Sequence, residues 1–249
     1  MRESRGFLVL VDISGYTEFI RSHNLKLVPI VGRRMKQTSQ VHAETVITDL
    51  LETLIAAVGN EFTLNKLEGD AALFFRESSA TGDESSDILN TMVNLFEVFG
   101  RRLEELMFCQ TCLCDCCQQM NQLKVKVFVH QGEFLVKRVA QFEEIAGHDV
   151  ILIHRLLKNS VPSNEYLLVT ESAMRTLPGA KGLLSFEQRV EHYDVGDVPI
   201  NVFYPTPNIE PQAKSPWLTR YRAMVAFFKT PKRKTELALR LLTGAQSPE

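Results

Sequence analysis

Two acidic turns hold the side chains of this sequence that are best suited to catalysis. Asp12 comes directly after the apolar residues 7–11, and Asp70 ends the turn 68–70 between two further apolar segments. Carboxylates at neighbouring strand ends can hold divalent cations, and a hard cation with few protein ligands and open coordination positions commonly handles a polyphosphate. An Asp-x-x-Gly turn is also common as a purely structural turn fixed by an Asx hydrogen bond, so each turn alone has two interpretations.

The cysteines form a second group with chemical potential. All five lie within nine residues, at Cys109, Cys112, Cys114, Cys116 and Cys117. Secreted disulfide frameworks distribute their cysteines over the fold, so this clustering favours a reducing compartment. A closed zinc site normally uses two cysteine pairs a dozen or more residues apart, whereas here the ligands would come from one loop or from two chains. An accessory Zn²⁺ site, redox-sensitive thiols and an inert surface loop all stay open.

Hydrophobic periodicity indicates the elements that must position these residues. Residues 7–11 are apolar and partly β-branched throughout, as is typical of a central strand. The complete pattern predicts strands at 7–11, 62–67, 71–75, 123–130, 134–139, 166–170 and within 183–204, and helices at 42–58, 88–107 and 149–157. The second and third strands, and the fourth and fifth, are predicted hairpins, and residues 77–87 are a predicted loop. This order predicts an α+β fold with helices on one face of a mainly antiparallel sheet.

Composition indicates the class of protein and the boundaries of its predicted domain. The 249 residues are 45% hydrophobic and 23% charged with a net charge of -2, which fits a folded protein with no global attraction to nucleic acid. Four prolines in 205–216 predict a linker after a domain of residues 1–204, followed by a helical extension at 217–249. Eight basic and three acidic residues in 205–249 give +5 there, which leaves -7 for residues 1–204. The apolar run at 7–11 is too short for a signal peptide, so we expect a cytoplasmic protein.

The basic extension has two interpretations. Its apolar residues can pack on the domain or on a partner chain, which is the interpretation that we favour, or its basic face can contact an anionic membrane.

Four segments in order resemble the class III nucleotidyl cyclases, the family of adenylate and guanylate cyclase catalytic domains. Residues 12–17 are similar to the first metal-binding motif, with Tyr16 in place of Phe, and residues 66–70 match the Lys-x-x-Gly-Asp motif. Residues 127–132 resemble the strand that ends in His-x-Gly, and residues 144–147 resemble the entry to the next helix. The resemblance covers about residues 6–204 and implies a ferredoxin-like cyclase fold. The cysteine run is similar to the short cysteine-rich insert of an uncharacterised bacterial branch of this family.

The resemblance also implies roles for individual residues. Asp12, Ile13 and Asp70 would form the metal site, Lys66 and Glu144 would bind the substrate base, and Arg155 would stabilise the transition state. An asparagine that orients the ribose is expected at the position of Ile151, one helical turn before Arg155. His148 or His154 are nearby polar residues that could take its place.

The implied activity is conversion of a nucleoside triphosphate, with ATP favoured, to a 3′,5′-cyclic monophosphate and pyrophosphate. Two Mg²⁺ or Mn²⁺ ions per site would take part, and the site would be shared across a homodimer. One chain would supply the metal carboxylates and its partner Lys66, Glu144 and Arg155. Because Ile151 removes an expected polar group, the alternative is a weak or inactive cyclase-fold module that binds nucleotide or senses metal or redox state through protein contacts.

Overall fold

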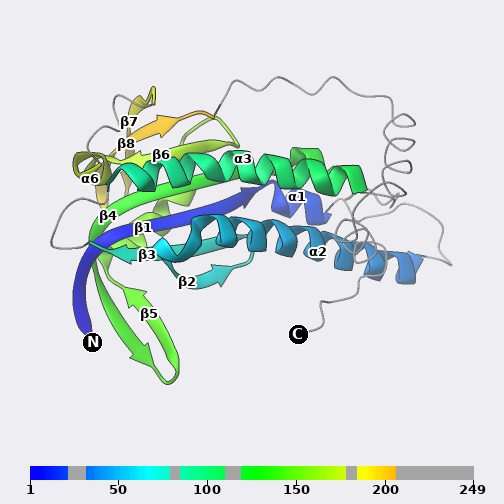
Figure 1. Cartoon of the computed structure of the whole chain (residues 1–249), viewed down its shortest axis with the longest axis horizontal. Coiled ribbons are helices and arrows are strands. Elements are labelled where there is room, and N and C mark those ends of the chain that lie inside the picture. The colour runs from blue at the N-terminus through cyan, green and yellow to red at the C-terminus, as the bar shows by residue number, and fades with distance from the viewer. Residues whose placement is uncertain (22–31, 79–84, 110–118, 178–183, 206–249) are drawn as a thin grey trace. The chain divides into compact units, whose positions relative to one another are not determined.

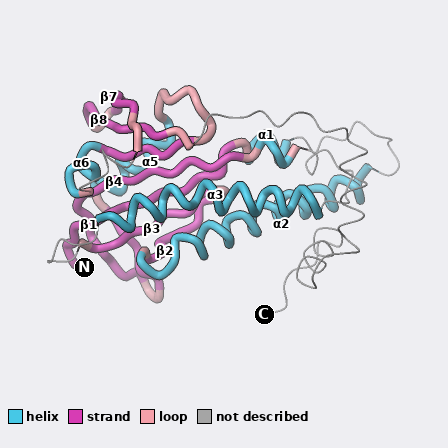
Figure 2. The backbone as a smooth tube through the Cα atoms, turned by 45° about the horizontal axis from the view of Figure 1, so that its top comes forward, coloured by secondary structure: helices cyan, strands magenta, loops and turns pink. Residues whose placement is uncertain are grey.

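The structure is a computed structural model that describes residues 1–21, 32–78, 85–109, 119–177 and 184–205 (Figures 1 and 2). Most of the cysteine cluster, all but the first residue of the predicted linker, and the predicted C-terminal extension lie outside the described residues. Within the described residues, no helix combines the length and hydropathy needed to cross a membrane.

The chain divides into two compact units. Unit 1 contains Met1–Ser14, Leu54–Glu97 and the described part of Val125–Pro207, and it holds essentially the whole sheet. Unit 2 contains the described parts of Gly15–Thr53 and Val98–Lys124. In unit 2, Arg102 of the third helix donates to both carboxylate oxygens of Asp49 in the second helix, from Nε at 2.5 Å and from Nη2 at 2.6 Å.

The described residues form one eight-stranded sheet. The strands are β1 (Arg2–Ser14), β2 (Thr63–Glu68), β3 (Ala71–Glu77), β4 (Lys124–Val139), β5 (Phe142–Ala146), β6 (Tyr166–Thr170), β7 (Glu187–Tyr193) and β8 (Gly196–Phe203). Their order is β2-β3-β1-β4-β6-β8-β7, and β5 pairs with β4 outside this path. The β4–β6 pair is parallel, whereas β1–β3, β2–β3, β4–β5, β6–β8 and β7–β8 are antiparallel. The predicted mainly antiparallel α+β architecture is confirmed.

The helices are mostly longer than the periodicity predicts. They are α1 (Tyr16–Arg21), α2 (Gly32–Val58), α3 (Ser85–Cys109), α5 (His148–Arg155) and α6 (Glu171–Thr176), with single 3₁₀ turns η1 (Gly59–Glu61), η2 (Met120–Gln122) and η3 (Leu156–Lys158). Gly59 has a φ of 71° directly after α2, and the helix ends at residue 58 as predicted. The short helices α1 and α6 were not predicted, because six residues are too few for a clear helical period.

Helices cover both faces of the sheet, so the prediction of one covered face is wrong. Leu8 and Leu10 of β1 share a core with Val150 and Ile153 of α5, and α5 contacts β1. The alternate β1 residue Val9 is also completely buried, although its side chain points to the opposite face. In Figure 1 the end of α2 and the first turns of α3 lie in front of the strands, and both belong to unit 1.

The predicted hairpin at residues 123–139 is also wrong. These residues form one continuous strand, β4, and the turn comes later, where Val139 pairs with Phe142. Gly132 lies between the two predicted strands, but it is inside β4, where a neighbouring carboxylate occupies the space that a Cβ atom would fill, as described below. The true turn contains Ala140 at a φ of 54° and has no glycine or asparagine to mark it.

Candidate active site

An acid pair lies at the end of β1. The β1–β3 register places Asp12 opposite Ala71, and the backbone N–H of Ile13 donates to the carbonyl oxygen of Asp70 at 3.1 Å. Asp12 alternates with Leu8 and Leu10, so its side chain is on the sheet face that α5 covers. The structure therefore brings together the two predicted metal carboxylates, which are 58 positions apart in the sequence.

The electrostatics of the acid pair are those of a site that would accept a cation. Burial raises the pKa of Asp12 to about 6, with the charge of Asp70 acting in the same direction and that of Lys126 acting against it. Burial also raises the pKa of Asp70, opposed by a hydrogen bond from its own backbone N–H. Desolvation and like-charge repulsion both disfavour the ionised carboxylates, and a bound cation would relieve both.

The chemistry of the donor set fits Mg²⁺ or Mn²⁺ with few protein ligands. Hard cations prefer carboxylate and carbonyl oxygens, and Ile13 has only its main-chain oxygen to offer because its buried side chain is apolar. Among the described residues, no group of three or more His, Cys, Asp or Glu side chains gathers as a metal site. The remaining positions around a cation would thus be left for water or substrate oxygens.

Lys126 is a site residue that the sequence interpretation missed. Its charge lowers the pKa of Asp12. Lys126 is paired with Tyr166 in the parallel β4–β6 ladder, and its Nζ atom lies 5.6 Å from the centroid of the Tyr166 ring. The alternation of lysine with valine in this strand showed that the lysines share one face, but only the strand order shows that this face meets Asp12.

A second polar cluster joins β2 to α5. Lys66 Nζ lies 2.5 Å from Glu68 Oε1, and His154 Nδ1 lies 3.3 Å from Glu68 Oε2. Burial lowers the pKa of His154, the charge of Lys66 lowers it further, and that of Glu68 raises it. Glu68 was not singled out from the sequence, although its i, i+2 spacing from Lys66 puts both side chains on one face of the strand.

The other predicted site residues are distributed over β5 and α5. Glu144 on β5 pairs with Lys137 of β4, with Oε2 and Nζ 3.4 Å apart. Arg155 at the end of α5 donates from Nη2 to Asp194 Oδ2 at 3.0 Å, and its buried Nε has no hydrogen-bond partner among the described residues. Ile151 is 53% exposed one turn earlier on the helix. Lys66 and Glu144 therefore have different ionic partners in this structure.

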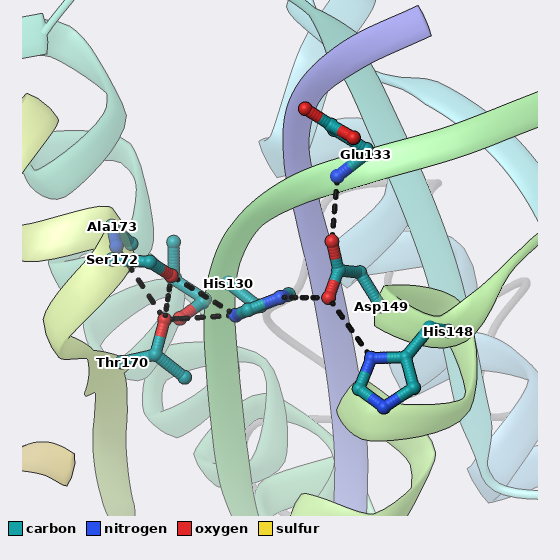
Figure 3. Close-up of polar contacts among 8 residues, drawn as sticks. His130, Glu133, His148, Asp149, Thr170, Ser172 and Ala173 are labelled. Atoms are coloured by element: carbon teal, nitrogen blue, oxygen red, sulfur yellow. Dashed lines mark hydrogen bonds and ion pairs between the residues drawn. The ribbon is translucent and has the colours of Figure 1, made fainter. Parts of the chain in front are cut away.

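A partly buried network around Asp149 connects the start of α5 to the sheet (Figure 3). Asp149 Oδ2 accepts a hydrogen bond from the backbone N–H of Glu133 at 2.6 Å, and Oδ1 lies 3.4 Å from His130 Nε2. On its other side, His130 Nδ1 lies 3.0 Å from Thr170 Oγ1 and 3.3 Å from Ser172 Oγ. The network connects β4, α5 and the N-terminal end of α6.

This network explains the His-x-Gly pattern in the strand. A Cβ atom on Gly132 would collide with the Asp149 carboxylate and lie 2.7 Å from the Asp149 Cβ. The pKa of Asp149 is lowered to about 2, chiefly by His130 and then by the N–H of Glu133, while burial opposes the shift. His130 thus contacts the Asp149 carboxylate, and Gly132 leaves the space that it occupies. Through Asp149, both residues position the helix that carries His154 and Arg155.

Comparison with known proteins gives limited sequence similarity. Residues 47–166, just under half of the chain, match a family described as proteins of unknown function (DUF2652). An uncharacterized protein of Mycobacterium tuberculosis is 37% identical over 131 residues, which cover 53% of this chain and 60% of that relative. The chain thus spans less than two thirds of the length of this relative.

Solved structures give similarity over most of the chain. The adenylyl cyclase CyaB from P. aeruginosa superposes with a TM-score of 0.58 at 12% identity, covering 83% of this chain and 97% of that one. A dimeric guanylyl cyclase domain of a fusion protein from the fungus Blastocladiella emersonii gives a TM-score of 0.51 at 12% identity, covering 82% and 98%. Identities this low identify the fold and leave the activity open. The chain has the fold of the adenylyl and guanylyl cyclase domains.

Proposed function

We propose that this chain is a nucleotidyl cyclase that converts a nucleoside triphosphate, with ATP favoured, to a 3′,5′-cyclic monophosphate and pyrophosphate. The observation that carries the proposal is the acid pair, because the β1–β3 register brings the half-buried Asp12 and Asp70 together at a strand end. The fold shared with adenylyl and guanylyl cyclase domains supports the same assignment.

Asp12, Asp70 and the main-chain oxygen of Ile13 are the groups that would hold Mg²⁺ or Mn²⁺. Two such ions, when bound, would activate the ribose 3′-hydroxyl and offset the charge of the pyrophosphate. The raised pKa values of both aspartates support this role, since they show that the ionised pair lacks sufficient compensating charge.

The remaining residues of the site would bind and orient the substrate. In the proposed reaction the ribose 3′-oxygen bonds to the α-phosphorus, its proton passes to solvent, and the bond from the α-phosphorus to the bridging pyrophosphate oxygen breaks. Arg155 would place fixed positive charge where the phosphate oxygens gain negative charge, and Lys126 would supply a further cation beside Asp12. Lys66 is the proposed contact to the base.

We further propose that the site is completed by a second copy of the chain. The metal carboxylates would come from one protomer, and Lys66 and Arg155 from the other. Exposed apolar side chains on β2, β5 and α5 support a partner surface there: Leu67 is 54% exposed, Phe142 61% and Ile151 53%. On this basis an isolated monomer would be inactive.

Ile151 favours a second candidate function, a cyclase-fold module that binds nucleotide without efficient turnover. An exposed apolar side chain at this position provides no hydrogen bond to a ribose. Loss of a polar group that acts in a transition state typically reduces the rate by roughly 10²–10³. The two candidates predict the same fold and nucleotide binding, and they differ in product formation.

The experiment that separates them is incubation of the purified chain with each of the four ribonucleoside triphosphates and Mg²⁺ or Mn²⁺, with products identified by mass spectrometry. We expect a cyclic product from ATP, and at least a ~100-fold lower rate in Asp12→Asn. Asp197→Asn is the matched control, because this carboxylate is 71% exposed on β8 and outside the site. A cyclic product that persists at the same rate in Asp12→Asn would refute the metal assignment, and no product under any condition would favour the binding module.

A further inference from the structure

We infer that Glu68, rather than Glu144, is the acidic partner of Lys66 in recognition of the nucleobase, and that His154 holds Glu68 in place. This inference rests on the proposed function, because it concerns the substrate specificity of the same site. It is carried by the contacts of the three residues on β2 and α5.

The geometry places a donor and an acceptor side by side. Lys66 and Glu68 are two residues apart on β2, so their side chains lie on the same face of the strand. The Lys66 ammonium lies 2.5 Å from one oxygen of Glu68, while the second oxygen lies 3.3 Å from His154 Nδ1. Glu68 is therefore oriented from two directions by groups on two different elements.

Glu144 has a different position and partner. It lies on β5, where Lys137 of the adjacent strand is its ionic partner at 3.4 Å. The contact between β2 and β5 is made by the Asn65 side chain, which donates to the carbonyl oxygen of Glu143 at 3.3 Å. The residue before Glu144 thus contacts β2 at Asn65, and the observed ion pairs assign only Glu68 to Lys66.

Stability alone does not account for the Lys66–Glu68 pair. The two side chains are 41% and 39% exposed, and ion pairs at such exposure contribute little to folding because solvent screens them. The position of His154 costs folding free energy. Burial lowers its pKa, and its Nε2 atom is buried without a hydrogen-bond partner among the described residues. In the tautomer that donates from Nδ1 to Glu68, Nε2 is a bare acceptor, which is less costly to leave unsatisfied than an N–H.

The pair of groups suits the edge of a nucleobase. An ammonium donates to a ring nitrogen or carbonyl oxygen, and a carboxylate accepts from an exocyclic amino group or ring N–H. Adenine presents a ring-nitrogen acceptor beside an exocyclic amino donor, which matches a lysine next to a glutamate. Each carboxylate oxygen has two lone pairs, so an oxygen that already contacts Lys66 or His154 can still accept from the amino group. Substituting the acceptor removes part of the discrimination, because polar groups in the site are then left without their partners.

Two matched substitutions test the assignment, Glu68→Gln and Glu144→Gln. Base preference is measured in two ways: as the ratio of kcat/KM for ATP over GTP, and by calorimetric titration with 3′-deoxy-ATP and 3′-deoxy-GTP in the presence of Mn²⁺. The 3′-deoxy nucleotides lack the attacking hydroxyl, so they report binding without turnover. We expect Glu68→Gln to reduce the adenine preference on the order of tenfold or more, and Glu144→Gln to change it less than about twofold.

His154 is tested as a positioning residue. We expect His154→Ala to weaken the adenine preference through KM and binding with a smaller effect on kcat, and His154→Asn to restore it, because the asparagine amide can donate from near the position of Nδ1. Circular dichroism of each variant verifies folding.

The outcomes separate this inference from the proposed function. A wild-type chain that binds 3′-deoxy-ATP selectively but forms no cyclic product would refute the proposed reaction and leave the assignment of Glu68 supported if Glu68→Gln removes the selectivity. Loss of the preference in Glu144→Gln with Glu68→Gln unchanged would overturn the inference and leave the cyclase activity intact. A wild-type chain that binds none of the nucleotides would overturn both.

Discussion

Asp149 allows a quantitative test of how α5 is held on the sheet. Its pKa falls from 3.8 to about 2 in the folded protein, because His130 and the N–H of Glu133 favour the ionised carboxylate. One pKa unit corresponds to about 1.4 kcal/mol, so ionised Asp149 stabilises the fold by about 2 kcal/mol at pH 7. The side chain is 24% exposed, so solvent screening reduces this value only moderately.

The pH dependence follows from the sign of the shift. Because the pKa is lower in the folded than in the unfolded state, the contribution is complete above the unfolded value of 3.8 and is lost as the pH falls through 3.8 to about 2. We expect Asp149→Asn to lower the free energy of unfolding by about 2 kcal/mol at pH 7, by roughly half of that at pH 3, and by less than about 0.5 kcal/mol at pH 2. Urea unfolding monitored by circular dichroism at these pH values measures the difference.

Two further variants complete the test. Asp197→Asn removes a carboxylate that is 71% exposed, so we expect a change below about 0.5 kcal/mol. Gly132→Ala displaces the Asp149 carboxylate from the network, so the double variant Gly132→Ala/Asp149→Asn is expected to be far less destabilised than the sum of the single variants. Equal destabilisation by Asp149→Asn at every pH, or full additivity with Gly132→Ala, would refute the assigned role of this carboxylate.

Three other predictions concern the proposed active site. Asp12→Asn removes a carboxylate whose pKa is raised to about 6, so we expect it to stabilise the metal-free chain by about 2–3 kcal/mol at pH 7, with no gain below about pH 4, when measured by urea unfolding. No gain in stability at pH 7 would contradict the conclusion that ionised Asp12 destabilises the metal-free chain. Ile151→Asn restores a polar group to the exposed helix position, and we expect a gain in kcat of roughly 10–100-fold with little change in KM; a slower variant would show that Ile151 does not limit turnover. Equal mixing of inactive Asp12→Asn and Arg155→Ala chains should restore about a quarter of the wild-type activity, because random pairing makes half of the dimers mixed and each has one intact site. Absence of recovery, despite mass-spectrometric evidence for mixed dimers, would argue against a shared site.

The parts of the fold that the sequence predicts are those encoded by local patterns. The apolar residues of β1, the strand β6 and the end of α2 at Val58, just before Gly59, all lie where periodicity and a following glycine place them. The parts that it does not predict depend on contacts between distant residues. A glycine at position 132 leaves room for the Asp149 side chain, although a glycine there resembles a turn signal. The actual turn contains Ala140 and has no residue type that is typical of turns.

The same division holds for the candidate site. Asp12, Lys66 and Asp70 are identified by motifs that resemble the cyclase family, and the β1–β3 register then explains why the two aspartates meet. Lys126 and Glu68 have no motif of their own. Their positions in the site follow from the strand order and from the packing of α5 against the sheet, which a single sequence does not specify.

Asp12 and Asp149 show how environment separates two identical side chains into different roles. Asp149 accepts a backbone hydrogen bond and faces His130, so its charge is compensated within the chain and its pKa falls to about 2. Asp12 is half-buried beside a second carboxylate, and the charge of Lys126 only partly offsets this, so its pKa rises to about 6. A structural role explains the first arrangement completely, since each oxygen of Asp149 has a partner. The ionised carboxylates in the second arrangement destabilise the fold until positive charge is added. This is the physical reason for proposing the catalytic centre at Asp12 and not at Asp149, which has more hydrogen-bond partners.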